Sequence, residues 1–145
     1  MYPVPVAEVA RTLGGPAVLG EQTDNLAGLS AAVSRGYPRR IVRELGDHAA
    51  PGAGALRAAV EALVASPATL KRSARLSPEA SARAERLGRV MALAEVSFGS
   101  AIDARQWLTE SHLMLGAMPI MVAATDLGAR QVERLLHNIA FDLPA

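Results

Sequence analysis

Three histidines carry the side chains best suited to acid–base or metal chemistry, but their spacing supports neither. His48, His112 and His137 lie far apart in the sequence, and none sits in a zinc-type spacing. His137 and Glu133 are four residues apart on one predicted helix face, which favours a minor surface pair over an acid–base dyad. We therefore interpret each histidine as a surface or helix-face residue.

Other catalytic signatures are missing as well. Gly52-Ala53-Gly54 is followed by Arg57 where a dinucleotide fingerprint has its third glycine, and no predicted strand precedes it. The sequence has no phosphate loop and no nucleophile elbow. The absence of cysteine excludes disulfides and thiolate metal sites. The sequence thus predicts no catalytic residue, no metal and no cofactor, and we expect a protein that is not an enzyme.

The last residues form a short apolar and acidic tail. Phe141 and Leu143 are apolar, whereas Asp142 and the carboxylate of Ala145 are anionic. Such a tail suits insertion into a pocket of another protein, particularly one built for an anionic ligand. A frayed C-terminus is the more common reading of such residues, and the residues alone leave both open.

The middle of the chain is basic. Residues 35–76 hold eight basic side chains and three acidic ones, although the net charge of the whole chain is only +1. This segment could meet a polyanion such as DNA, or it could form a solvated helix face. Two helices separated by a tight turn are predicted here, and they have the outline of a helix-turn-helix. Its candidate DNA-binding residues are Thr69, Lys71, Arg72 and Arg75.

Composition indicates the fold class that must position these groups. Half of the 145 residues are hydrophobic, alanine is abundant, and only 3% are aromatic. Alanine has the highest helix propensity, and strand-like runs of β-branched and aromatic residues are nearly absent. We therefore predict an all-α protein, a small helical bundle. No signal peptide and no apolar run of about 18 residues is found, so a cytoplasmic protein is the default expectation.

Local signals predict where the helices begin and end. The predicted capping residues are Asp24, Ser66, Ser77, Ser100 and Thr125. The predicted stops are Gly36, Gly46 and Gly99. We predict helices from Pro67 to Ala74, from Pro78 to Phe98, and from Thr125 to Ile139.

Apolar spacing predicts which side chains turn inward. In the helix after Asp24 these are Leu26, Leu29 and Val33. In the last helix they are Leu127, Val132, Leu135, Leu136 and Ile139. Trp107, the only tryptophan, is expected to anchor the core of the C-terminal half. The first 24 residues are rich in proline and glycine, so we expect an extended or mobile arm with at most a helical turn at Val6–Leu13.

The ordered set of residues from position 76 to 141 resembles the toxin-binding domain of the Xre/MbcA/ParS antitoxin family. The matching residues are Leu76–Ser81, Arg83, Arg86, Leu87, Val90, Ala94, Phe98, Gly99, Ala104–Leu108, Leu115, Gly116, Pro119, Thr125, Gly128–Glu133, Leu135 and Leu136. Upstream, Gly36–Pro38 and Ser66–Arg72 resemble the family's degenerate Xre-like helix-turn-helix region. The resemblance divides the chain into an N-terminal arm (1–24), an Xre-like helical region (25–76) and a toxin-binding domain (77–145).

The resemblance implies an antitoxin that neutralises a RES-domain toxin, an enzyme that consumes NAD or transfers its ADP-ribose. It implies that the C-terminal segment reaches the NAD pocket of the toxin, and that the protein is a homodimer within a hetero-oligomeric complex that binds its own operator DNA. The implied toxin-binding residues are Arg130, Glu133, His137, Asn138, Phe141, Asp142, Leu143 and Ala145. A stand-alone helix-turn-helix regulator is the alternative, and no membrane partner is expected.

Overall fold

The computed structural model describes residues 2–20, 23–52 and 54–141, and within them every regular element is a helix. The elements are α1 (Val6–Thr12), α2 (Pro16–Leu19), α3 (Leu26–Arg35), α4 (Arg40–Ala49), α5 (Gly54–Val64), α6 (Pro67–Arg72), α7 (Pro78–Phe98), α8 (Ala101–Leu108), α9 (Pro119–Val122) and α10 (Asp126–Ala140). The prediction of an all-α protein is confirmed.

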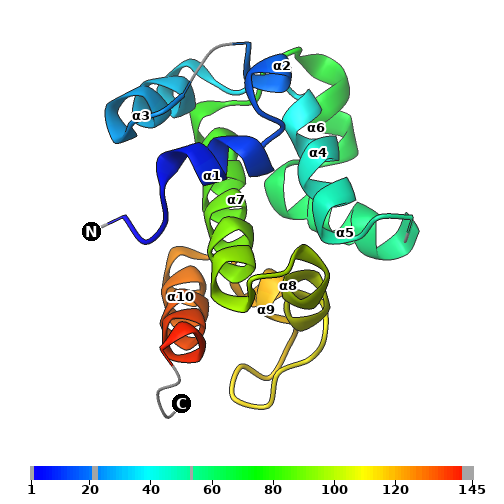
Figure 1. Ribbon diagram of the computed structural model, residues 1–145. Helices are drawn as coiled ribbons and strands as arrows, with labels where there is room; N and C mark the ends of the chain where they lie inside the picture. Colours follow the sequence, from blue (N-terminus) through cyan, green and yellow to red (C-terminus); the bar gives the residue numbers. More distant parts are fainter. Residues whose placement is uncertain (1, 21–22, 53, 142–145) are drawn as a thin grey trace.

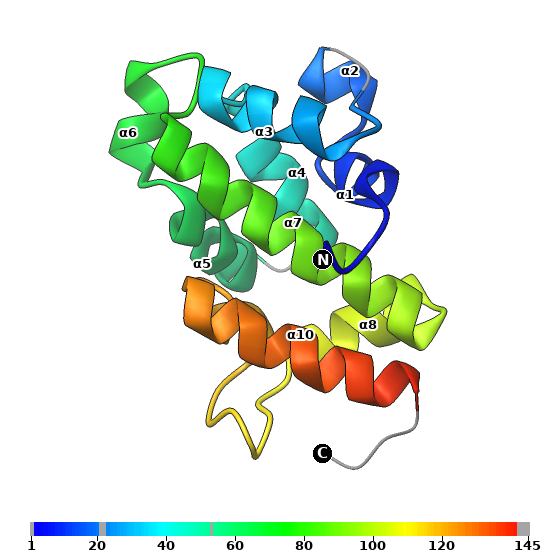
Figure 2. The ribbon, with the colours of Figure 1, turned by 90° about the vertical axis from the view of Figure 1, so that its left-hand side faces the viewer.

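Helix α7 runs through the middle of the molecule, and helices from both halves of the chain pack on it (Figures 1 and 2). It is 21 residues long because Ser77 caps its start and Gly99, with φ 69°, closes its end. Its buried residues include several small ones, among them Ala80, Ala84 and Ala94. Small side chains let neighbouring helix axes come close, so α7 can be covered on several sides.

The capping signals read from the sequence are nearly all confirmed. The hydroxyls of Ser66, Ser77, Ser100 and Thr125 each accept a hydrogen bond from the backbone N–H three residues later. Asp24 is the exception, because its neighbour Asn25 caps α3 instead and accepts from the N–H of Gly28 at 2.8 Å.

The expectation of an extended N-terminal arm is wrong for residues 2–20. Helix α1 packs against α7, and Val4, Val9 and Leu13 are fully or almost fully buried. Val9 and Leu13 are four residues apart, so they share one face of the helix, and that face covers the small residues of α7. The prolines and glycines of this segment separate two short helices rather than preventing helix formation.

Gly46 does not end α4, which continues to Ala49. A Cβ atom at this position would lie 2.8 Å from Cγ of both Arg57 and Glu61 on α5. The glycine therefore permits the close crossing of α4 and α5 rather than acting as a stop.

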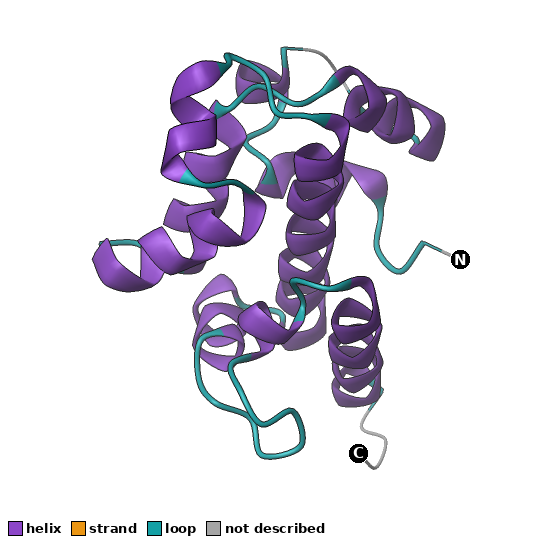
Figure 3. Cartoon of the chain, turned by 180° about the vertical axis from the view of Figure 1, so that it is seen from behind, coloured by secondary structure: helices purple, strands orange, loops and turns teal. Residues whose placement is uncertain are grey.

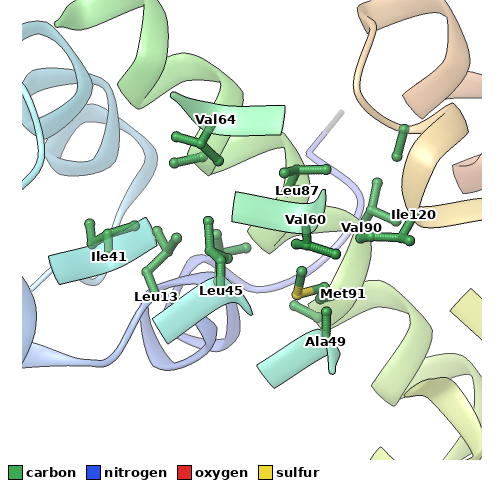
Figure 4. Close-up of a cluster of buried hydrophobic side chains, with 14 of the residues drawn as sticks. Leu13, Ile41, Leu45, Ala49, Val60, Val64, Leu87, Val90, Met91 and Ile120 are labelled. Carbon is green, nitrogen blue, oxygen red and sulfur yellow. The ribbon is translucent and has the colours of Figure 1, made fainter. Parts of the chain in front are cut away.

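The core is one continuous cluster whose members come from all parts of the chain. Figure 4 shows its centre, where side chains of α4, α5 and α7 meet Leu13 and Ile120. Trp107 is not at this centre, contrary to expectation. It is half-buried at the edge, with its ring centroid 5.9 Å from that of Phe98 and 5.7 Å from that of His112.

Two leucines predicted to face inward are exposed instead. Leu26 is 53% exposed on α3 and Leu127 is 71% exposed on α10. Both lie in the first turn of their helix, where only part of the inward stripe reaches a neighbour. Ile139, at the other end of α10, is also exposed, at 39%.

Gly128 should not tolerate a side chain, whereas Gly28 should. Both occupy the third position of a helix and donate to a capping side chain. A Cβ at Gly128 would overlap the carbonyl oxygen of Val122, but at Gly28 the nearest atom is 3.4 Å away. We expect Gly128→Ala to lower the free energy of unfolding by about 2 kcal/mol or more. Gly28→Ala, the matched control, should be neutral or stabilising by less than about 1 kcal/mol. Urea denaturation measures both, and equal effects would contradict the packing argument.

Candidate functional site

Helix α10 packs on α7 through its apolar face. Ala129, Val132 and Leu136 are fully buried, and the helix begins at Thr125, whose Oγ1 accepts from the N–H of Gly128 at 3.0 Å. Its other face is polar and exposed. The structure thus presents this outer face on a rigid support.

Two of the predicted site residues on α10, Arg130 and Glu133, differ in their contacts. Arg130 is exposed and forms a solvent-facing ion pair with Asp126, with Nη2 3.1 Å from Oδ2. Glu133 is turned toward α7, where its Oε1 accepts a hydrogen bond from Nε of Arg89 at 2.6 Å. The predicted surface pair between Glu133 and His137 is therefore wrong, because Arg89 binds this carboxylate instead.

The C-terminal end of α10 carries an aromatic pair. The rings of His137 and Phe141 lie 4.7 Å apart, centroid to centroid, at an angle of 48°. Phe141 is 65% exposed although it is a large apolar side chain. Asn138 is half-buried beside them. The other predicted tail residues, Asp142, Leu143 and Ala145, lie outside the described residues.

A mostly buried charge cluster joins α10 to α7 and to the N-terminus. Arg89 donates from Nη1 to Oε1 of Glu85 at 2.7 Å and from Nε to Glu133, and the hydroxyl of Tyr2 donates to Glu85 at 3.3 Å. Burial raises the pKa of Glu85 above its usual range, although the positive charge of Arg89 opposes this. Burial, reinforced by Glu85, also raises the pKa of Tyr2.

Sequence reasoning did not find this cluster. The i, i+4 spacing of Glu85 and Arg89 was its only visible signal, since the other partners are distant in sequence. An open cavity of about 480 Å³ adjoins the cluster and is lined by Leu26, Leu29 and Val33 of α3. Among the charged residues that line the cavity, Glu85 and Arg89 are paired with each other, whereas Arg86 donates to the carbonyl oxygen of Ala124. Asp126 is paired with Arg130 on its own helix. Each has a structural partner, so we do not interpret them as a catalytic set.

A second polar cluster contains the chain's only histidine–carboxylate contact among the described residues. His48 Nε2 lies 2.5 Å from Oε1 of Glu95, and Arg11 donates to Oε2 of Glu95 at 2.7 Å. Burial alone would raise the pKa of Glu95, but the hydrogen bonds from Arg11 and His48 lower it. The space beside this cluster is about 10 Å³, too small for a substrate. The contacts among Arg11, His48 and Glu95 therefore link α1, α4 and α7.

The C-terminal helices match a known family. Residues 93–141 correspond to the antitoxin Xre/MbcA/ParS C-terminal toxin-binding domain. The match begins near the end of α7 and includes α8, α9 and α10, and it confirms the resemblance predicted from the sequence. A comparison with curated proteins gave no match.

The toxin-binding domain includes Arg130, Glu133, His137, Asn138 and Phe141. In the described part of the chain, no group of three or more His, Cys, Asp or Glu side chains could hold a metal ion. Nor is any helix described there both long enough and apolar enough to cross a membrane.

Outside the toxin-binding domain, the predicted DNA-binding residues are only partly free. Arg75 donates to the carbonyl oxygen of Gly36 at 2.7 Å, and Arg72 donates to Oγ1 of Thr69 at 3.3 Å. Lys71 instead lines an open groove of about 400 Å³ between α4 and α6.

This basic groove also contains three arginines of the α4 region that sequence reasoning did not select, Arg39, Arg40 and Arg43. Glu61 is the only acidic residue lining it. Among the described residues, neither Arg40 nor Arg43 makes an ion pair, so their charges face solvent. The groove therefore concentrates positive charge on a surface remote in sequence from the toxin-binding domain.

Replacing Arg89 with methionine should destabilise the protein in a pH-dependent way. The change leaves Glu85 and Glu133 without their cation, at an expected cost of about 3 kcal/mol near neutral pH. Without Arg89 the pKa of folded Glu85 rises further, so the folded state binds more protons than the unfolded state. Stability must then fall as pH rises, and the deficit should be larger at about pH 7 than at about pH 5.

Urea denaturation of the wild type and the variant at both pH values measures this deficit. Arg130→Met, which breaks the exposed pair with Asp126, is the control and should change stability by less than about 0.5 kcal/mol. An Arg89→Met deficit that is independent of pH would contradict the assigned role of Glu85.

Proposed function

We propose that the protein binds and neutralises a RES-domain toxin, an enzyme that consumes NAD or transfers its ADP-ribose. The match of residues 93–141 to an antitoxin toxin-binding domain carries this proposal. The geometry supports it, because this segment offers a helix whose apolar face is buried and whose polar face is exposed.

In this proposal the outer face of α10 docks on the toxin. Arg130 and His137 are exposed there and can meet acidic or polar groups. Glu133 serves mainly to hold α10 through Arg89, but its second oxygen accepts no hydrogen bond from the described residues and can take a donor from the toxin. Asn138 lies on the same helix, in its last turn.

The C-terminal segment would then fill the NAD pocket. Phe141, exposed and in tilted contact with the ring of His137, is the base of this plug, and Asp142, Leu143 and Ala145 follow it. The carboxylate of Asp142 would stand in for a cofactor phosphate against an arginine of the toxin. Inhibition by occlusion requires no chemistry from the antitoxin itself.

Two truncations separate docking from plugging. A chain ending at Phe141 keeps all of α10, whereas a chain ending at Asn138 also loses the aromatic pair. We expect the first to bind the toxin yet fail to stop NAD consumption, and the second to bind more weakly as well. Calorimetry measures binding, and NAD consumption by the purified toxin measures inhibition. Full inhibition by the chain ending at Asn138 would rule out the plug.

We also propose that the basic groove between α4 and α6 contacts operator DNA, with a homodimer supplying two half-sites. Its four cationic side chains against one carboxylate support this, as does their exposure. Helix α6 has only six residues, so phosphate contacts should outweigh base contacts. A stand-alone regulator would use the same groove without a toxin.

Binding of operator DNA by the toxin–antitoxin complex should weaken steeply with salt, because each phosphate contact releases counterions. Arg40→Gln and Arg43→Gln should each reduce the slope of log K against log salt by about 0.9. Arg134→Gln, an exposed arginine of α10, is the control and should leave the slope unchanged. Fluorescence anisotropy over a salt series measures the slopes. Tight binding by the isolated chain would favour the stand-alone regulator, and an unchanged slope in both groove variants would exclude the groove.

A further inference from the structure

The segment between α8 and α9 closes into an ordered loop at residues 112–117. The N–H of His112 donates to the carbonyl oxygen of Ala117 at 3.0 Å, and the N–H of Gly116 donates back to that of His112 at 2.9 Å. Gly116 has φ 73°, a conformation that glycine adopts without strain. Leu115 and Met118, partly buried, pack on the core and anchor the loop at its base.

The side chain of His112 braces this loop from inside. Its ring meets the ring of Trp107 edge to face, with centroids 5.7 Å apart. Its Nδ1 accepts a hydrogen bond from the N–H of Met114 at 3.2 Å. The loop tip is thus held in one conformation by the helix that precedes it.

The tip presents two apolar side chains to solvent. Leu113 is 97% exposed, more than any other large apolar residue among those described, and its neighbour Met114 is 62% exposed. Burying such a side chain is worth about 1.5–3 kcal/mol. Because the loop is already ordered, little of this free energy is offset by lost conformational entropy when a partner covers the tip.

The loop and helix α10 lie at the same end of the molecule. Figures 1 and 2 show the loop beyond α10, on the side away from α2, α3 and α6. Figure 3 shows it from behind as a long connection that projects from the helices. A protein that binds the aromatic pair at the end of α10 can therefore reach the loop as well.

The chemistry around the tip indicates the kind of partner. Residues 111–125 include no Asp, Glu, Lys or Arg, so the loop offers no cation for a phosphate or an anionic lipid headgroup. It is suited to an apolar depression on a protein. The whole loop lies inside the segment that matches the toxin-binding domain, which favours the toxin over other proteins.

We propose that the 112–117 loop is a second docking point, which inserts Leu113 and Met114 into an apolar depression on the toxin while His112 positions them. This inference rests on the proposed antitoxin function. In this proposal the loop provides affinity for the toxin, whereas the tail inhibits the toxin. Leu113 and Met114 form the affinity hot spot, and neither touches the NAD pocket.

The test measures the Kd for a purified RES-domain toxin that the wild-type chain inhibits, by calorimetry without NAD. The double variant Leu113→Asp/Met114→Asp should raise Kd at least about 30-fold, as loss of a hot spot does. Leu26→Asp, which changes an exposed leucine of α3, is the matched control and should leave Kd unchanged. Helix α3 lies at the opposite end of the molecule from the loop (Figure 1). At saturating concentration the double variant should still inhibit fully, because its tail is intact.

Two variants of His112 test its positioning role. His112→Ala should raise Kd about tenfold without changing the residues that touch the toxin. His112→Asn should restore much of the affinity, since its side-chain oxygen can still accept from the N–H of Met114. Equal thermal midpoints for the folded variants confirm that affinity, not folding, has changed.

The outcomes are distinguishable. An unchanged Kd in the double variant, or an equal loss in Leu26→Asp, overturns the loop inference and leaves the antitoxin function standing. Loss of self-association in the double variant with an unchanged Kd for the toxin assigns the tip to a second copy of the chain, which also overturns the inference. A wild-type chain that does not bind the toxin overturns the proposed function, and the loop inference with it.

Discussion

Close approach of helices to α7 is the constraint on which the rest of the molecule depends. Alanine and glycine along α7 leave room for α1 on one side and α10 on another. A Cβ at Gly88, for example, would lie 3.0 Å from Cδ2 of Leu13. Because the core contains few aromatic side chains, its stability must come from many tight contacts between small residues. Such a core is sensitive to added volume.

Features set by neighbours in sequence were predictable, and features set by distant partners were not. Ser77 and Thr125 were identified as caps because a capping hydroxyl bonds to an N–H three residues later. Leu26 and Leu127 were wrongly predicted to face inward, because the spacing of apolar residues does not show where the helix that would cover them ends. Gly46 was read as a stop because its contact with α5 is invisible in the local pattern.

In the candidate site too, features set by nearby residues were predictable from the sequence, whereas contacts with distant partners were not. The family resemblance located α10 and its end, which the family match confirms from residue 93 onward. The partner of Glu133 was missed because Arg89 lies 44 residues away, and i, i+4 spacing suggested His137 instead. Likewise, Lys71 was selected from a helix-turn-helix outline, but the arginines that share its groove come from α4. Charged residues that come together from separate helices form no single sequence motif.

The contact between Trp107 and His112 has a practical consequence. Trp107 is the only indole of the chain, it is half-buried, and its ring touches the residue that braces the apolar loop. Indole emission responds to polarity and solvent access, so covering or loosening the loop would change the intrinsic fluorescence of a single chromophore. The protein therefore carries an intrinsic fluorescent reporter beside the loop that exposes Leu113 and Met114, and rapid-mixing kinetics could follow that region without an attached dye.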